Sequence, residues 1–328
     1  MGWQTTGDVA EFLAAAGAFL RAERARNTVF LTVTETMRAN PAQYHGRDDA
    51  DPARLPLFGW WTVAGGVRGA FMHTPDFPVL LTAVPAEVAA DLAAQTLAGR
   101  PLPGVNAYPE AAKAFGAAWR EQTGGRVAVH REMRLYRLAG LSWPRPMPDG
   151  VPRTAGEGDV ALLTDWLTAF GREVNDMERG DLAASIRERF SYGGLTLWEA
   201  DGKPVSVAGL TRRAAGMVRV GPVYTPPELR GHGYASAATA EVSQAALAAG
   251  AEEVLLYTDL ANPVSNAIYQ RLGYQEIEDR IVLSFSQRLP SVGASRLGPS
   301  APEDIVLLTG RFSVLLSKPP KCVGSRET

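Results

Sequence analysis

The alternation of apolar and polar positions divides the chain into short strands and amphipathic helices, and their order occurs twice. In the first part, an alanine-rich helix is predicted at residues 12–20. It precedes three strands, two helices and a long strand, with Gly-Gly and Thr-Pro-Asp turns between the strands. These later elements are expected at residues 58–63, 67–72, 79–84, 86–97, 109–122 and 127–138.

The second part begins with two helices and three strands, after which helices and strands alternate. These elements are expected at residues 159–173, 182–190, 195–199, 205–211, 217–224, 234–249, 254–258, 263–272 and 281–285. Both parts contain the order strand, strand, strand, helix, strand or turn, helix, strand, so the pattern indicates a duplicated α+β unit.

A proline-rich segment separates the two parts. Pro144, Pro146 and Pro148 stand at alternate positions, which favours extended backbone over helix. We therefore expect one domain at residues 1–140, a linker at residues 141–150 and a second domain at residues 151–287. Residues 288–328 begin with glycines and prolines, include a possible hairpin around Thr309-Gly310 and end with basic residues; they are predicted to form a flexible extension.

Composition narrows the classes of protein. At about 150 residues per domain, 328 residues suit two domains, and 46% hydrophobic residues suffice for their cores. Lys and Arg number 33 against 35 Asp and Glu, which argues against a nucleic-acid-binding protein. The single cysteine, Cys322, excludes a disulfide framework and a cysteine-based zinc site. His45, His73 and His130 lack the spacing of metal ligands, so no metal is expected.

The chain shows no export signal or membrane span. The first charged residue is acidic, and the most apolar later stretch, residues 235–249, is interrupted by Glu241 and Gln244. A cytoplasmic protein is the expectation.

The chemically informative segment is a strand, a loop and a helix at residues 218–249. Gly231 and Gly233 allow main-chain amides to approach a ligand closely. The helix that begins there directs unpaired N–H groups and the positive end of its dipole to the same point, and Arg230 adds a mobile cation. His232 is assigned to this anion cradle for its amide rather than its imidazole. Four alanines are predicted to face the sheet: Ala235, Ala238, Ala245 and Ala249.

The ligand of this cradle is not predicted to be a dinucleotide. Ser236 stands where the dinucleotide fingerprint needs a third glycine, two prolines separate the strand from the loop, and a P-loop lysine is absent. Gly221-Pro222 lies inside the strand, and proline cannot donate to a β-ladder. Pairing must break there, which leaves main-chain groups for an extended ligand that carries amides.

The motif Glu228-Leu-Arg-Gly-His-Gly233 resembles that of the GCN5-related N-acetyltransferase (GNAT) superfamily, with glutamate where the family has Gln or Arg. The resemblance implies two GNAT-like domains, each a mostly antiparallel twisted sheet flanked by helices. It also implies that the backbone of Val223 and Tyr224 pairs with the pantetheine of acetyl-CoA. Loop amides are then expected to hold the pyrophosphate, from Arg230, Gly231, His232, Gly233, Tyr234, Ala235 and Ser236.

A second segment, residues 257–274, is similar to the closing strand and helix of the same family. Asn262 suits the N-cap and Gly273 the position after the helix. The resemblance implies that Asn262 contacts the cofactor and that Tyr269 protonates the departing thiolate. Ser265, on the same helix face as Tyr269, is assigned to the cofactor site as well. The other interpretation of Tyr269 is an aromatic side chain that packs the helix onto the sheet.

The first part shares the layout without the cradle. The corresponding strand is followed by Ala86-Glu-Val-Ala-Ala-Asp91, which has neither the glycine pair nor the arginine. The first part therefore resembles a degenerate GNAT domain, as in tandem members of the family.

Together these features predict an acetyl-CoA-dependent N-acetyltransferase that acts on a primary amine by direct transfer in a ternary complex. The alternative is a non-catalytic acyl-CoA-binding regulatory module. The acceptor stays open among a small amine, an antibiotic, an amino acid and a protein, and no oligomeric state is assigned. Glu173, Glu199 and Glu228 are in the right half to act as general base, but none is chosen.

Overall fold

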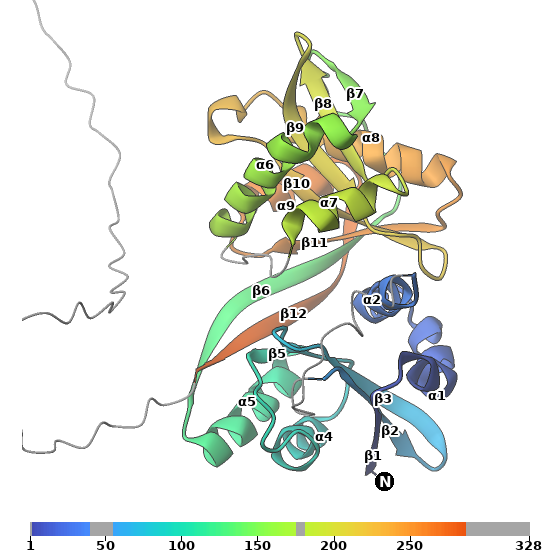
Figure 1. The fold of residues 1–328 in the computed structure, drawn as a ribbon, viewed down its shortest axis with the longest axis vertical. Coiled ribbons are helices and arrows are strands. Elements are labelled where there is room, and N and C mark those ends of the chain that lie inside the picture. Colours follow the sequence, from blue (N-terminus) through green and yellow to red (C-terminus); the bar gives the residue numbers. More distant parts are fainter. Residues whose placement is uncertain (1, 40–54, 175–180, 287–328) are drawn as a thin grey trace, which may run out of the picture. The chain divides into compact units, whose positions relative to one another are not determined.

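The structure, a computed structural model, describes residues 2–39, 55–174 and 181–286 (Figure 1). The strands of the first half are β1 (Gly2–Thr6), β2 (Leu57–Val63), β3 (Gly66–His73), β4 (Val79–Leu81), β5 (Gly104–Ala107) and β6 (Arg126–Leu138). Its helices are α1 (Val9–Ala22), α2 (Thr28–Ala39), α4 (Ala86–Asp91), which continues as a short π-helix (Leu92–Thr96), and α5 (Pro109–Thr123).

The second half, residues 151–286, repeats this succession. Its strands are β7 (Val151–Thr154), β8 (Leu195–Ala200), β9 (Lys203–Leu210), β10 (Met217–Tyr224), β11 (Glu253–Asp259) and β12 (Tyr274–Ser286). Its α-helices are α6 (Val160–Glu173), α7 (Leu182–Phe190), α8 (Tyr234–Ala248) and α9 (Pro263–Arg271), and 3-10 turns cover Glu157–Asp159 and Pro227–Leu229. All strands join one mixed sheet in the order β1-β2-β3-β4-β5-β12-β6-β11-β10-β9-β8-β7.

Several element ends follow from local chemistry. Asp8 accepts hydrogen bonds from the amides of Ala10 and Glu11 and so begins α1. Pro109 occupies the first position of α5, where its missing N–H costs nothing, and Gly124 ends that helix at φ +65°. These signals are short-range, which is why the sequence predicts most helices and strands within a few residues of their ends.

The last strand of each half completes the sheet of the other half. β6 pairs with β11, with Leu135 opposite Tyr257, while β12 pairs with β5, with Ile281 opposite Ala107. β6 and β12 also pair with each other over almost their whole length (Figure 1). The two halves are therefore joined by exchanged strands as well as by residues 141–150.

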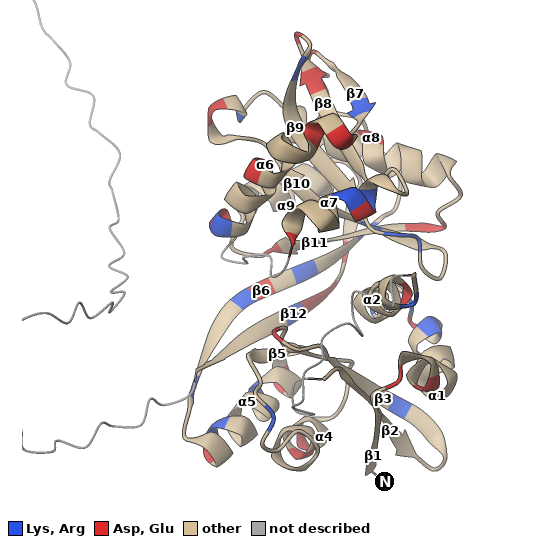
Figure 2. Ribbon diagram, in the orientation of Figure 1, with Lys and Arg blue, Asp and Glu red and all other residues tan. Residues whose placement is uncertain are grey.

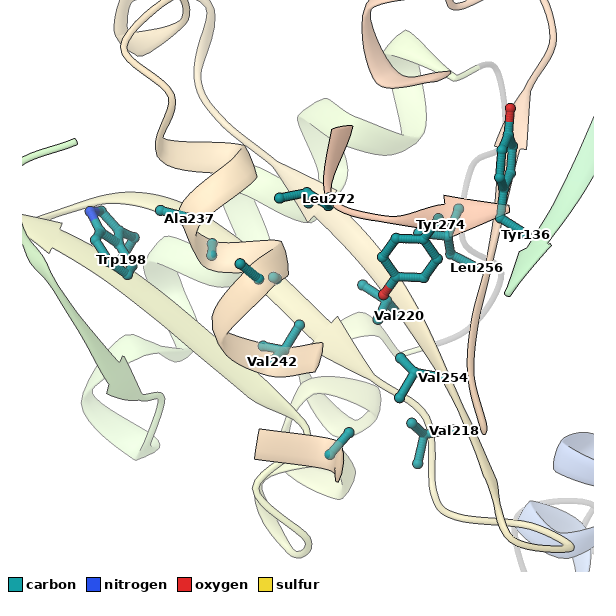
Figure 3. Close-up of a cluster of buried hydrophobic side chains, with 14 of the residues drawn as sticks. Tyr136, Trp198, Val218, Val220, Ala237, Val242, Val254, Leu256, Leu272 and Tyr274 are labelled. Atoms are coloured by element: carbon teal, nitrogen blue, oxygen red, sulfur yellow. The ribbon is translucent and has the colours of Figure 1, made fainter. Parts of the chain in front are cut away.

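Side chains from both halves share hydrophobic cores. Ile281 and Leu283 of β12 lie in the first half's core beside α4 and α5, while Tyr136 of β6 lies in the core beneath α8. Figure 3 shows this second core, in which Ala237 and Val242 of α8 lie over the sheet. Basic and acidic positions are interspersed along the ribbon of both halves (Figure 2).

The predicted phase of α8 is wrong. Of the four alanines expected to face the sheet, Ala238 alone is buried, whereas Ala245 and Ala249 are exposed. The buried positions are Ala237, Ala238, Thr239, Ala240, Val242, Ser243 and Ala246. An alanine-rich helix has little difference in polarity between its faces, so the pattern defines its orientation weakly.

The predicted fold class is confirmed: the chain is mixed α/β, with a mostly antiparallel sheet and helices on both faces. The sequence missed β1, β5, β7 and α2, and it predicted only the second part of β12. The expected extension at residues 288–328, with its hairpin, lies outside the described residues, and the domain boundaries stay a prediction.

We expect the two halves to fold together but not separately. A chain cut between Trp143 and Pro144 yields fragments that each lack the strand next to β5 or β11, together with the buried side chains of that strand. Co-expressed fragments should form a 1:1 complex with the melting cooperativity of the intact chain, whereas each fragment alone should aggregate or stay unfolded. Size-exclusion chromatography and thermal melting check this, and a folded monomer of either fragment would contradict it.

Candidate functional site

The site begins where β10 leaves β11. The two strands pair in parallel from Met217 opposite Glu253 to Val220 opposite Leu256, and the pairing ends there. The register between β10 and β9 also shifts between Val220 and Val223. The predicted break at Gly221-Pro222 is confirmed, and its cause is the missing N–H of proline. Beyond this point an open seam separates β10 from β11, with main-chain groups on its edges.

Beyond the seam, the chain turns into α8 through two glycines in left-handed conformations. Gly231 and Gly233 have φ angles of +82° and +84°, which side chains with a Cβ seldom adopt. Ala237 makes the first helical hydrogen bond, to the carbonyl of Gly233. The amides of residues 231–236 have no acceptor among the described residues, so they form a group of free donors at the positive end of the helix dipole.

Arg230 is paired with neighbouring groups of the protein. Its Nε donates to the carbonyl of Thr225 at 2.8 Å, and its Nη2 lies 2.7 Å from each carboxylate oxygen of Glu173. The guanidinium also lies 5.7 Å from the centre of the Tyr224 ring. Glu173, one of the candidate bases, is thus an ion-pair partner that fixes the loop.

His232 contributes to the loop through its ring as well as its backbone. Its Nδ1 lies 3.2 Å from the carbonyl of Leu229, and its ring stacks on Tyr234 with centroids 5.5 Å apart. The loop is therefore ordered by its own contacts before any ligand binds, which suits a preformed anion cradle.

α9 lies on the same face of the sheet as α8. The Asn262 side chain accepts a hydrogen bond from the amide of Ser265 at 3.0 Å and begins the helix. Gly273 follows it at φ +96°, and a Cβ there would lie 1.9 Å from the carbonyl oxygen of Gly140. The close approach of the linker therefore requires this glycine.

Tyr269 is half-buried at the end of α9, against the same core as Val223 and Tyr234. Its ring lies edge-on to Tyr274 at 6.1 Å, and Tyr274 in turn hydrogen-bonds Ser243 of α8. The Tyr269 hydroxyl has no hydrogen-bond partner among the described residues. Burial raises the pKa of Tyr269 to about 12, so the hydroxyl stays protonated at neutral pH. This state suits a proton donor.

A residue of the first half positions α9. The Tyr136 hydroxyl, from β6, donates to the side-chain oxygen of Asn266 at 2.9 Å. The amide nitrogen of Asn266 donates to the carbonyls of Asp259 and Asn262, both at 2.8 Å. The exchanged strand is thereby connected to the helix that carries Tyr269.

A pocket of about 350 Å³ opens on the other face of the sheet, beneath α6 and α7. Gly221 and Pro222 line it from β10, and Tyr257 lines it from β11, so it meets the seam from the side opposite the cradle. Phe170, Arg189 and Arg219 also line it. These two arginines are not among the site residues that the sequence predicts.

The remaining candidate bases do not line this pocket. Glu199 accepts a hydrogen bond from Arg153 at 2.9 Å, and Glu228 is exposed on the turn before the cradle. Among the described residues, no group of three or more His, Cys, Asp or Glu is placed to hold a metal ion. No helix in the described ranges is long and apolar enough to cross a membrane.

The equivalent seam of the first half is filled. β4 and β5 pair in parallel only at Val79 and Leu80, and the buried guanidinium of Arg280 lies across the point where they part. Its Nη2 donates to the carbonyl of Leu81 at 2.7 Å and to that of Asn106 at 3.0 Å. The arginine comes from β12, so the second half closes the seam of the first.

Comparisons with known proteins agree with this geometry. Residues 160–274 match the model of the acetyltransferase (GNAT) family. Mycothiol acetyltransferase of Streptomyces coelicolor is 31% identical over 160 residues, which are 45% of this chain and 51% of that protein. The matched region thus spans about half the length of that curated relative.

Two solved structures share the fold. A GCN5-related N-acetyltransferase from Sphaerobacter thermophilus has a TM-score of 0.53 at 17% identity and covers 87% of this chain and 95% of its own. A tandem GNAT protein from the clavulanic acid biosynthesis pathway has a TM-score of 0.51 at 15% identity, and the match covers 88% of this chain and 100% of that protein. Residues 160–274 thus match the GNAT family, and the fold of the described chain is similar to that of a tandem GNAT protein.

We expect one coenzyme A site per chain. The second half has an open seam with free amides beside it, whereas Arg280 occupies the seam of the first half. Isothermal titration with coenzyme A should therefore give a stoichiometry of one. Two equivalent sites per chain would show that the first half has kept its cradle.

Proposed function

We propose that this chain is an acetyl-CoA-dependent N-acetyltransferase that moves the acetyl group directly to a primary amine in a ternary complex. The observation that carries the proposal is the open seam between β10 and β11, with free amides on one face of the sheet and a pocket on the other. Two ligands that approach from opposite faces meet in such a seam, which suits direct transfer between them.

In this proposal the amides of residues 231–236 bind the pyrophosphate of acetyl-CoA. The main-chain groups of Val223 and Tyr224 that face the seam pair with the pantetheine arm. Asn262 and Ser265 lie at the start of α9, on the same face as the cradle, and are assigned to the cofactor as well. Arg230 and Glu173 hold the loop that presents these amides.

The chemistry needs one nucleophile and one acid. The neutral amine nitrogen attacks the thioester carbonyl carbon, and main-chain N–H groups at the seam stabilise the oxyanion that forms. The C–S bond then breaks, and the sulfur receives the proton of the Tyr269 hydroxyl. The nitrogen loses its extra proton to water, from which Tyr269 is reprotonated.

Valine at Gly231 should weaken cofactor binding strongly at little cost in fold. A β-branched residue resists φ near +82° and places carbon atoms where phosphate oxygens approach. Loss of charge-assisted hydrogen bonds from the cradle should raise the dissociation constant of coenzyme A by about 10- to 100-fold. Calorimetry measures the constant, and circular dichroism monitors the fold.

Gly124→Val is the matched control for this variant. Gly124 also has a left-handed φ, +65°, and a Cβ there would also meet open space, but it ends α5 in the first half. The control should lose comparable stability and keep the affinity for coenzyme A. If both variants bind coenzyme A with the affinity of the wild type, the pyrophosphate does not lie at Gly231.

Tyr269→Phe should slow transfer and leave coenzyme A affinity unchanged. The variant keeps the ring against Tyr274 and removes only the hydroxyl, and a positioned acid contributes about 100-fold or more. Because the pKa of Tyr269 is raised to about 12, the wild-type rate should show no loss of this acid between pH 6 and about 10. Turnover and affinity are measured on one preparation; an unchanged turnover number would leave Tyr269 as a packing residue.

Coenzyme A binding without turnover on any amine would favour the regulatory module instead.

A further inference from the structure

The pocket beneath α6 and α7 carries two positive charges. Arg189, in the last turn of α7, and Arg219, on β10, both line it and are half-buried. No Asp or Glu is among the described residues of its lining. A pocket with this charge favours anions over cations.

Arg219 is bound to a neutral group. Its Nη1 donates to the hydroxyl oxygen of Thr32 at 2.9 Å, and that hydroxyl donates to the carbonyl of Thr28 at 2.8 Å. Burial and the nearby charge of Arg189 lower the pKa of Arg219 to about 10, so it remains a cation at neutral pH. Helix α2 of the first half thus orients a cation whose charge is not balanced within the described part of the chain.

Arg189 is bound in the same way. Its Nη1 donates to the carbonyls of Leu210 and Gly221, at 3.1 Å and 3.2 Å, and both acceptors are neutral. Within the described ranges, Nε and Nη2 of both arginines have no acceptor. A planar guanidinium can bind a carboxylate through two parallel hydrogen bonds, so these donors are available to an anionic ligand.

Other arginines of the second half are paired with carboxylates. Three of them pair with a carboxylate at 2.7 Å, and none of the three lines the pocket. They are Arg187 with Glu157, Arg212 with Glu188, and Arg230 with Glu173. A half-buried cation whose charge is not balanced among the described residues costs free energy, so its place in a pocket at the seam calls for an anionic ligand.

The hydroxyl of Tyr257 is an independent observation of the same kind. It is buried and has no hydrogen-bond partner among the described residues, and Tyr257 directly follows Leu256, the last residue of β11 that pairs with β10. Buried polar atoms are nearly always paired in folded proteins. A ligand in the pocket would supply the missing partner.

We propose that the acceptor is a small amine that also carries a carboxylate or phosphate, and that Arg219 and Arg189 bind this anionic group. The proposal rests on the proposed function and names the substrate class of the same site. The anion lies against the two guanidiniums, and the amine lies at Gly221 and Pro222, where the seam opens. A pocket of about 350 Å³ suits a molecule the size of an amino acid.

The first test compares matched amines on the wild-type chain. Amino acids are paired with their carboxamides, and aminoalkyl phosphates with the corresponding amino alcohols, while acetyl-CoA consumption is followed by release of free thiol. The anionic member of at least one pair should have a kcat/KM higher by about 10- to 100-fold, the usual value of a charge-assisted contact. The two series distinguish a carboxylate from a phosphate.

The second test removes the arginines. Arg219→Met should abolish the preference for the anionic member, and Arg219→Lys, which keeps the charge but loses the planar fork, should retain part of it. Arg187→Gln removes one positive charge from α7 outside the pocket and should change nothing. Wild-type affinity for coenzyme A shows that each variant is folded.

A third readout is independent of turnover. N-acetylated amino acids and acetylated aminoalkyl phosphates, the expected products, should raise the melting temperature of the wild type in the presence of coenzyme A but not that of Arg219→Met. Acetylation of neutral amines without a preference for anionic ones would overturn this inference and leave the proposed function intact. Stabilisation by these products without acetylation of any amine would support the anion site and contradict the proposed function. If the products do not stabilise the protein and no amine is acetylated, both the anion site and the proposed function are contradicted.

Discussion

The site depends on one interruption of a β-ladder, where Pro222 cannot donate a hydrogen bond and β10 turns away from β11 after Val220. Parallel strands inside a mixed sheet normally leave no gap between them, because each main-chain group pairs with its neighbour. The interruption creates a seam through the sheet. The cradle at α8 meets it from one face and the arginine pocket from the other, so both proposed ligands depend on this single local break.

The two halves share one order of elements but differ at their seams. In the first half, the guanidinium of Arg280 satisfies the carbonyls of Leu81 and Asn106 where the strands part, so that seam is closed by protein. The first half supports the second instead: Tyr136 positions α9, and Thr32 orients Arg219. The exchange of β6 and β12 makes this support part of the sheet itself.

Much of the second half could be predicted because its signals are short-range. The glycine pair before α8 and the Asn262 cap of α9 each act within a few residues, and the structure has the expected elements there. α2 was missed for the opposite reason. Its threonines are poor helix formers, and the hydroxyls of Thr32, Thr34 and Thr36 donate to carbonyls one turn earlier, so burial against the core overrides propensity.

By itself, the sequence determined the secondary structure around the cradle, the break at Gly221-Pro222 and the family to which these motifs belong, because each depends on residues close together in the chain. Only the tertiary structure decided that β6 and β12 change places, that Arg280 fills the first seam, and that Arg189 and Arg219 face one pocket. Arg219 and Thr32 are 187 positions apart, and Arg280 and Leu81 are 199 apart. Contacts over such separations leave no periodic or local pattern, since they are made only when the sheet brings distant strands together.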